Sequence, residues 1–535
     1  MQERSLKSMK KPIAASISAA LVAMMVVAFP AIARAADPVC TEAGASFQLS
    51  YESCTGVDDL GAKYEIRMPS KFNGTLMLWS HGIRFAVPLP AIPVVNPVAT
   101  GVNMEADVAP SEAVASELLA QGYALAGSGF NRQGWNAEDA VISNIQLINL
   151  AKSKYAKIKK VTAWGASMGG FITQSMQEQF PTMIDAAAPL CTATNTPLAE
   201  FKYAGDFLFG IKTFFDPTIM GSGYAAGQAG YMQMIGDIQK VLTVFGSIQA
   251  AITANPLAPA WPASSTAPAA LQAIPVRSAL LLVGLLAGIP TQSNSFDASS
   301  GPAGPLETSF GLAISPALAV LENGVQGAML GIVGTYGEEM KMGGRFYDNS
   351  TTNWATQISQ DDLDAYNAGL SGTSAITAML GYLTVAGQRV KADPIARARF
   401  ESQYVQTGDI NVPTVAMTGL ADPIVPPGNT QWLIDRGTNP KNLVVLWNRT
   451  PETYTEFNGL SPVSKSPAAA TNGTNHCNFT TEQLLLAAKI ANSAAKTGKL
   501  PTLKTINGLV AKVNTYDTTL FVDPDFAATP LKYNQ

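Results

Sequence analysis

The chain has 535 residues and a formal net charge of −4 at pH 7, with 14% charged and 47% hydrophobic residues. A mildly acidic chain without a basic cluster argues against a nucleic-acid-binding protein. The length exceeds one ordinary domain, so we expect a core with a large insertion.

Residues 1–35 have the pattern of a secretory signal peptide, with a basic start, an apolar stretch and a small-x-small cleavage site. The apolar stretch is short and carries two serines, which makes a retained anchor the weaker alternative. Cleavage would start the mature chain near Ala36 and remove five basic residues and one acidic residue, changing the formal charge from −4 to −8. We therefore expect a secreted or periplasmic protein with no stable membrane span. The basic start is Arg4 to Lys11, the apolar stretch is Ile13 to Phe29, and the cleavage site is Ala33-Arg34-Ala35.

Four cysteines agree with export and allow three disulfide pairings. Cys40 and Cys54 are close in sequence, so we favour a bridge that staples the mature N-terminus. The remaining two, Cys191 and Cys477, would then form a long-range link.

The first third of the mature chain alternates between strand-like and helix-like segments. Segments of these lengths predict an α/β fold, with a mostly parallel, doubly wound sheet covered by helices on both faces. The expected strands are 62–68, 74–80, 123–127, 161–164 and 184–191, and the expected helices are 111–121, 139–158 and 171–180.

This alternation stops at Cys191 and resumes near Val412. The apolar segments between them (235–252, 268–287 with a break at Pro275, and 310–331) predict a helical cap. Strands at 412–418 and 442–447 and helices at 429–436 and 480–496 follow, and the tail from 500 to 535 would return to the core surface. The expected organisation is a core over 36–191, a mainly helical cap over 192–410, and the rest of the core with a tail over 411–535.

Gly165-Ala166-Ser167-Met168-Gly169 lies directly between an expected strand and an expected helix. This is the context of a G-x-S-x-G nucleophile elbow, in which a sharp turn holds the serine hydroxyl above the sheet. The amide of Met168 would then point to where an oxyanion forms. A chance match in a chain with 45 glycines is the alternative.

This order of elements resembles the α/β-hydrolase superfamily over residues 60–191 and 410–497, with a cap inserted after the strand that follows the nucleophile helix. The resemblance implies a triad in the order Ser, acid, His. Asp422, directly after the 412–418 strand, matches the acid, although an Asp-Pro pair also starts turns. His476, before the last long helix, matches the base, the alternative being a surface-loop histidine. His81 would brace the oxyanion loop, so that the amide of Ile83 is the second oxyanion donor.

The His476-Cys477 pair is similar to that of tannases and feruloyl esterases, in which the cysteine after the histidine is bridged to a cysteine before the nucleophile. Ala166 stands at that preceding position here, which departs from the motif. Cys191 ends a neighbouring strand, so a Cys191–Cys477 bridge would tie the histidine loop to the sheet edge.

These features predict a secreted serine hydrolase that cleaves carboxylic esters, with an apolar or aromatic substrate and no metal or organic cofactor. The alternatives are a secreted serine peptidase of the same fold and a catalytically silent binding protein. Glu338-Glu339 is similar to the paired glutamates of dipeptidyl peptidases, but we expect a solvated acidic pair. The aromatic residues near the end of the cap (Phe346, Tyr347 and Trp354) are expected to pack in its core.

Overall fold

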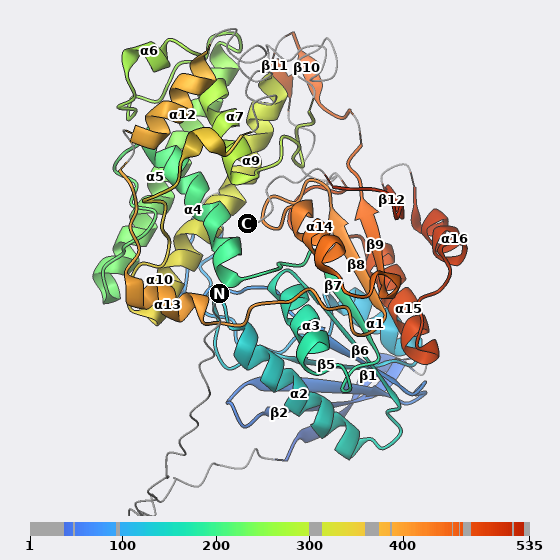
Figure 1. The fold of residues 1–535 in the computed structure, drawn as a ribbon. Helices are drawn as coiled ribbons and strands as arrows, with labels where there is room; N and C mark the ends of the chain where they lie inside the picture. Colours follow the sequence, from blue (N-terminus) through green and yellow to red (C-terminus); the bar gives the residue numbers. More distant parts are fainter. Residues whose placement is uncertain are drawn as a thin grey trace, which may run out of the picture.

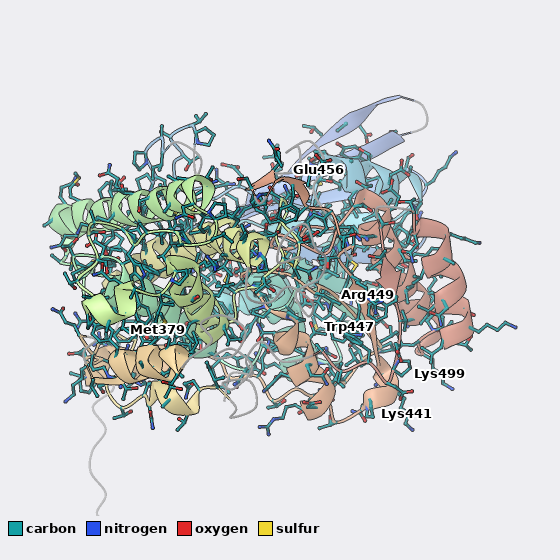
Figure 2. All side chains as sticks on the ribbon, turned by 90° about the horizontal axis from the view of Figure 1, so that it is seen from above. Met379, Lys441, Trp447, Arg449, Glu456 and Lys499 are labelled. Atoms are coloured by element: carbon teal, nitrogen blue, oxygen red, sulfur yellow. A yellow bond between two sulfur atoms is a disulfide. The ribbon has the colours of Figure 1, made fainter. Side chains whose placement is uncertain are left out.

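The computed structural model describes residues 37–46, 49–92, 97–298, 313–358, 374–385, 388–451, 453–459, 461–463, 472–515 and 518–528. The expected signal peptide, residues 1–35, lies outside these ranges. Two lobes form the molecule, an α/β core and a helical cap, and they lie side by side (Figure 1). Seen from above, Met379 lies in the cap, on the opposite side of the molecule from Lys441 and Lys499 of the core (Figure 2).

The core contains a sheet of ten strands in the order β1-β2-β3-β5-β4-β6-β7-β8-β9-β12. The strands from β5 to β9 in this order run parallel to one another, and antiparallel strands flank them on both sides. This confirms the α/β fold expected from the alternating segments. The bounds are β1 Val39–Ser46, β2 Leu49–Val57, β3 Lys63–Pro69, β4 Thr75–Ser80, β5 Ala124–Ser128, β6 Lys160–Ala166, β7 Ala186–Leu190, β8 Thr414–Gly419, β9 Leu443–Asn448 and β12 Leu520–Phe521.

Helices cover both faces of this sheet, because its central strands are apolar on both sides. All six residues of β4 are buried, for example. Helices α2 and α3 pack on one face, whereas α1, α15 and α16 pack on the other. The core helices are α1 Glu112–Ala120, α2 Ala137–Lys154, α3 Met168–Gln179, α14 Pro427–Arg436, α15 Thr481–Thr497 and α16 Leu503–Val513.

All the helices of the cap lie between β7 and β8 along the chain. Their apolar faces form a separate core cluster, distinct from the two on the faces of the sheet. The cap elements are α4 Pro197–Phe214, α5 Gly227–Ala254, α6 Ala269–Gln272, α7 Val276–Ala287, α9 Ile314–Met329, the π-helical turn η1 Leu330–Gly334, α10 Thr335–Met342, the 3-10 turn η2 Trp354–Thr356, α12 Ala375–Val385 and α13 Pro394–Glu401.

Within the described ranges, one helical stretch has the length and apolar composition to cross a membrane, Ile314–Met342. It spans α9, η1 and α10 in the interior of the cap, and 72% of its most apolar window is buried by the protein. Burial against neighbouring helices accounts for its composition.

A segment after β9 leaves the core and contacts the cap. It carries the hairpin β10 Glu456–Asn458 and β11 Ser461–Val463, which lies at the rim of the cap (Figure 1). The backbone amides of Tyr454 and Thr455 donate to Oδ2 of Asp297. The second part of the chain thus includes a cap contact that the sequence pattern does not indicate.

Candidate active site

Ser167 lies between β6 and α3 in a backbone conformation that few non-glycine residues adopt, with φ 59° and ψ −123°. The glycines around it allow the close approach of the backbone. A Cβ on Gly165 would lie 2.4 Å from the carbonyl oxygen of Gly169, and one on Gly169 would lie 1.9 Å from that of Ser80. The amide of Ser167 donates to the carbonyl of Leu190 at 3.0 Å, which fixes the turn against β7. The G-x-S-x-G segment therefore forms the expected sharp strand-to-helix turn.

Asp422 and His476, which are 54 residues apart, form a close pair. Nδ1 of His476 lies 2.9 Å from Oδ1 and 3.0 Å from Oδ2 of Asp422. The carboxylate is 1% exposed and also accepts the amides of Ile424, Val425 and Cys477 at 2.9, 2.9 and 3.0 Å. These donors hold the carboxylate in place. Because a carboxylate only accepts hydrogen bonds, Nδ1 of His476 is the donor of the pair, which leaves Nε2 of the neutral ring as an acceptor.

A disulfide between Cys191 and Cys477 connects this pair to the elbow. Cys191 directly follows Leu190, the residue whose carbonyl accepts the Ser167 amide. Cys477 directly follows His476, and a carboxylate oxygen of Asp422 lies within 4.8 Å of both sulfur atoms. The bridge places the histidine loop at the end of β7, next to the elbow strand. The second disulfide joins Cys40 and Cys54 across β1 and β2, so the structure has the pairing that we favoured.

The segment after β4 passes directly over the serine. A Cβ on Gly82 would lie 3.2 Å from Cβ and 3.7 Å from Oγ of Ser167. The backbone leading to Ile83 is therefore close to the hydroxyl, and Met168, the other expected oxyanion donor, is the first residue of α3. His81 is 4% exposed, and its Nδ1 lies 2.7 Å from the carbonyl oxygen of Gly82. This contact fits the expected bracing role.

His81 is kept neutral by its surroundings. Burial lowers the pKa of its imidazole to about 4, and the nearby charge of Arg84 acts in the same direction. Its ring packs on Phe130 with 4.3 Å between ring centroids. Of the two histidines in the chain, His476 is thus the one that has a carboxylate partner.

Sequence reasoning missed Glu200, a buried carboxyl close to Asp422. It lies in the first turn of α4 and is 4% exposed, and it accepts the amide of Thr194 at 3.2 Å. Burial is the main reason that the pKa of Glu200 is raised to about 8, and the nearby charge of Asp422 acts in the same direction. The Thr194 hydroxyl lies 3.0 Å from Oδ1 of Asn429 in α14, so these contacts join the start of the cap to the acid loop. A glutamate in a first helical turn is common, and nothing in the sequence marks this one as buried.

Glu338 and Glu339 form no solvated pair, and that expectation is wrong. Each is 1% exposed. Glu338 accepts the amide of Trp135 in the core at 2.7 Å, whereas Glu339 accepts the amides of Gly223 and Tyr224 at 2.8 and 3.1 Å. Backbone amides of this chain thus bond to both carboxylates, and Nζ of Lys341 lies 3.4 Å from Oε2 of Glu338; sequence spacing cannot reveal these contacts.

The cap also contacts the histidine loop and packs its own aromatic residues inside. Nε2 of Gln326 in α9 lies 3.3 Å from Oδ1 of Asn475, the residue before His476. Phe346 stacks on Phe400 with 4.1 Å between ring centroids, and Trp354 is 1% exposed. Packing inside the cap is therefore the role of these aromatics, as expected.

No family model matches the sequence, and no curated protein matches it. Its structure is similar to that of feruloyl esterase B from Aspergillus oryzae, with 13% identity, a TM-score of 0.38 and coverage of 88% of this chain and 89% of that one. It is also similar to tannin acyl hydrolase from Aspergillus niger, with 11% identity, a TM-score of 0.35 and coverage of 87% and 84%. Similarities this low transfer no residue role or substrate to this chain.

Proposed function

We propose that the mature chain is a secreted serine hydrolase that cleaves carboxylic esters through Ser167, His476 and Asp422. The observation that carries this proposal is the His476–Asp422 pair, joined by a disulfide to the strand beside a strained serine turn. The side chains come from three separate loops at the carboxyl edge of parallel strands, where open α/β sheets place their sites.

In the proposed reaction, the Ser167 hydroxyl oxygen attacks the ester carbonyl carbon as Nε2 of His476 accepts its proton. The amides of Met168 and Ile83 stabilise the resulting oxyanion. Collapse of this intermediate expels the alcohol, which takes the proton from His476, and leaves an acyl group on Ser167. A water molecule, deprotonated by His476, then attacks the acyl carbon and releases the acid. Throughout, Asp422 fixes the Nδ1–H tautomer and stabilises the imidazolium.

The seam between core and cap supports a hydrophobic or aromatic acyl group. Ile83 is partly buried beside Gly82, and it packs on the same apolar cluster as Leu198 and Leu330 of the cap. Apolar side chains from both lobes thus belong to one cluster, which also includes Met168, the residue directly after the serine. An acyl chain placed there would bury apolar surface without leaving a buried charge unpaired.

Among the residues that the structure describes, no contact specifically favours a peptidase. The paired glutamates that suggested capture of a peptide amino group are buried and already accept backbone amides. The peptidase and the silent binding protein are therefore outcomes of the test, rather than proposals.

The test compares p-nitrophenyl acetate, butyrate and octanoate with aminoacyl p-nitroanilides, using purified mature protein. We expect turnover of the esters, with kcat/KM rising with acyl length, and at least a 10³-fold loss in Ser167→Ala. Ser175→Ala is the matched control, because Ser175 is a buried serine of α3 whose hydroxyl donates to the Phe171 carbonyl of its own helix and lies 3.4 Å from Nε2 of Gln406. Turnover of anilides alone would indicate a peptidase, whereas inactivity of a folded protein toward both sets would indicate a binding protein.

A further inference from the structure

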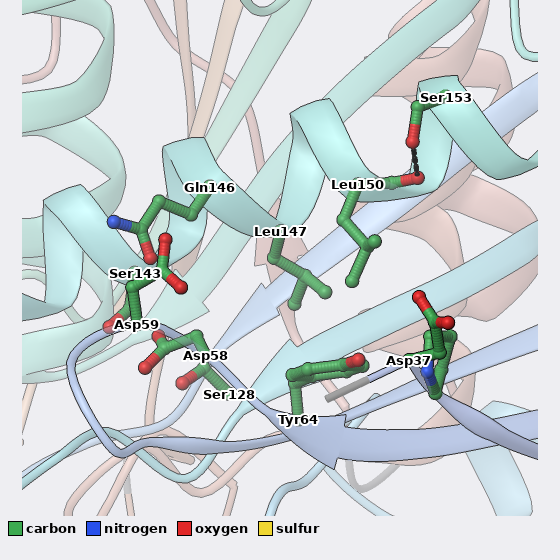
Figure 3. Close-up of a pocket in the computed structure, with 11 residues that line it drawn as sticks. Asp37, Asp58, Asp59, Tyr64, Ser128, Ser143, Gln146, Leu147, Leu150 and Ser153 are labelled. Atoms are coloured by element: carbon green, nitrogen blue, oxygen red, sulfur yellow. Dashed lines mark hydrogen bonds between the residues drawn. The ribbon is translucent and has the colours of Figure 1, made fainter. Parts of the chain in front are cut away.

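A cavity of about 350 Å³ lies at the β1–β3 edge of the core. Helix α2 forms one wall, with Gln146, Leu147 and Leu150. The opposite wall contains Tyr64 of β3 and the turn at Asp58, which leads from β2 into β3 (Figure 3). None of the proposed catalytic residues lines this cavity, so it is separate from the site at the elbow.

The polar atoms of the α2 wall lack donors. Ser143 is 1% exposed, and its hydroxyl has no hydrogen-bond partner among the described residues. Oε1 of Gln146 is likewise buried and, within the same part of the chain, without a donor. Both side chains lie on the side of α2 that faces Asp58 and Asp59 (Figure 3). Buried acceptors of this kind are usually satisfied, so they indicate a missing donor.

The charge of the lining has one sign. Asp37, Asp58 and Asp59 contribute carboxylates, and the lining residues include no lysine, arginine or histidine. The amides of Leu60 and Ala62 both bond to Oδ1 of Asp58, and no donor from the described part of the chain contacts its Oδ2. An anionic ligand would be repelled, whereas a cation with N–H donors would meet both the charge and the unpaired oxygens.

Apolar side chains line the rest of the cavity. Leu147, Leu150 and Pro38 line the cavity beside the Tyr64 ring. Burial and the negative charges of Asp37 and Asp58 raise the pKa of Tyr64, so its hydroxyl stays protonated and neutral. A ligand with a charged head and a short hydrocarbon part would fill both halves of the cavity.

We propose that this cavity binds a primary ammonium group carried on a short apolar chain. The ligand is a free small amine from the surroundings, whose ammonium group would lie at the end of the cavity formed by Ser143, Gln146 and Asp58 (Figure 3). The proposal does not depend on the proposed esterase activity.

The test measures binding of n-butylammonium by calorimetry, with n-butanol as the neutral control. It uses the mature protein, which we expect to bind butylammonium at least tenfold more tightly than butanol. Equal weak binding of both compounds would overturn the proposal.

Two variants check that binding occurs in this cavity. Ser143→Ala and Asp58→Asn should each weaken amine binding at least tenfold. Asn at 58 keeps an oxygen for the two backbone amides of the turn, so the local fold is retained. Glu42→Gln, an exposed residue on neighbouring β1, makes the same charge change as Asp58→Asn outside the cavity and should leave binding unchanged. All three variants should hydrolyse esters as the parent protein does.

Discussion

Removing the Cys191–Cys477 disulfide should lower kcat even under conditions in which the protein remains folded, so that the loss of stability does not explain the effect. The bridge spans 286 residues of sequence, for which the chain-entropy relation gives about 5.5 kcal/mol. The Cys40–Cys54 bridge spans 14 residues, and the same relation gives about 3 kcal/mol. Replacing both cysteines of each pair by alanine should therefore lower the urea midpoint in both variants, and more for the long-range bridge.

The catalytic effect follows from the backbone beside the histidine. Cys191 and Cys477 have φ values of 38° and 53°, and Asn475, just before His476, has 59°. Such conformations cost on the order of 1–3 kcal/mol each and persist only where the surroundings hold them. Without the bridge, this loop can relax and move His476 away from Ser167, and a displacement of about 1 Å can cost 10²-fold in rate.

The assay compares kcat and KM for a p-nitrophenyl ester at 25 °C, where all variants remain folded by circular dichroism. Cys191→Ala/Cys477→Ala should lower kcat by about 10²-fold with little change in KM, whereas Cys40→Ala/Cys54→Ala should keep kcat within about twofold. Equal kcat values in the two folded variants would refute the positioning argument and leave the bridge a stabilising role only.

Three further outcomes follow from the structure. Gly169→Ala would place a methyl group 1.9 Å from the Ser80 carbonyl oxygen, so it should destabilise the protein by about 2 kcal/mol or more in urea unfolding. Gly508→Ala is its control, because a Cβ there meets nothing within 4 Å, and it should change stability by less than about 1 kcal/mol. Glu200 keeps its proton up to about pH 8 when folded but releases it near pH 4.5 when unfolded, so it lowers stability as pH rises through this window. Glu200→Gln lacks this loss. Between pH 5 and 8, its free energy of unfolding in urea titrations should therefore rise relative to that of the parent, by at most on the order of 4 kcal/mol. A constant difference in the free energy of unfolding from pH 5 to 9 would speak against the buried acid. N-terminal sequencing of the exported protein should give a start at Ala36, and a start at Met1 would contradict cleavage.

Local patterns were sufficient to predict the central part of the fold. Leu76 to Trp79, directly before Ser80, form an unbroken apolar run, and the segment at Ser167 has glycines where a side chain would collide with backbone. Such features depend on neighbours in the sequence, so the strands, the helices and the sharp turn could be anticipated. The Asp422–His476 contact was inferred from resemblance, since nothing local reveals that two loops 54 residues apart will meet.

Features that depend on tertiary contacts were missed or wrongly predicted. Glu200, Glu338 and Glu339 look like exposed helix residues, but each is buried. Glu338 and Glu339 accept backbone amides from distant segments, whereas Glu200 accepts the amide of Thr194 and lies close to Asp422 of a distant loop. The β1–β2 hairpin was not anticipated, because its polar side chains lack strand-like alternation; instead, pairing with β3 and the Cys40–Cys54 bridge hold it. Whether a glutamate is buried depends on the residues that contact it, and whether a hairpin joins the sheet depends on the strand that pairs with it. The periodicity of the sequence identifies neither.

Reaction with a fluorophosphonate probe tests the central claim most directly, because only an activated serine forms the covalent adduct. Intact-mass and peptide analysis should show one adduct per mature chain, on Ser167, and none in Ser167→Ala. Labelling should be at least 10²-fold slower in His476→Ala. An adduct on another residue, or a folded protein that does not react, would contradict the assignment of Ser167 as nucleophile.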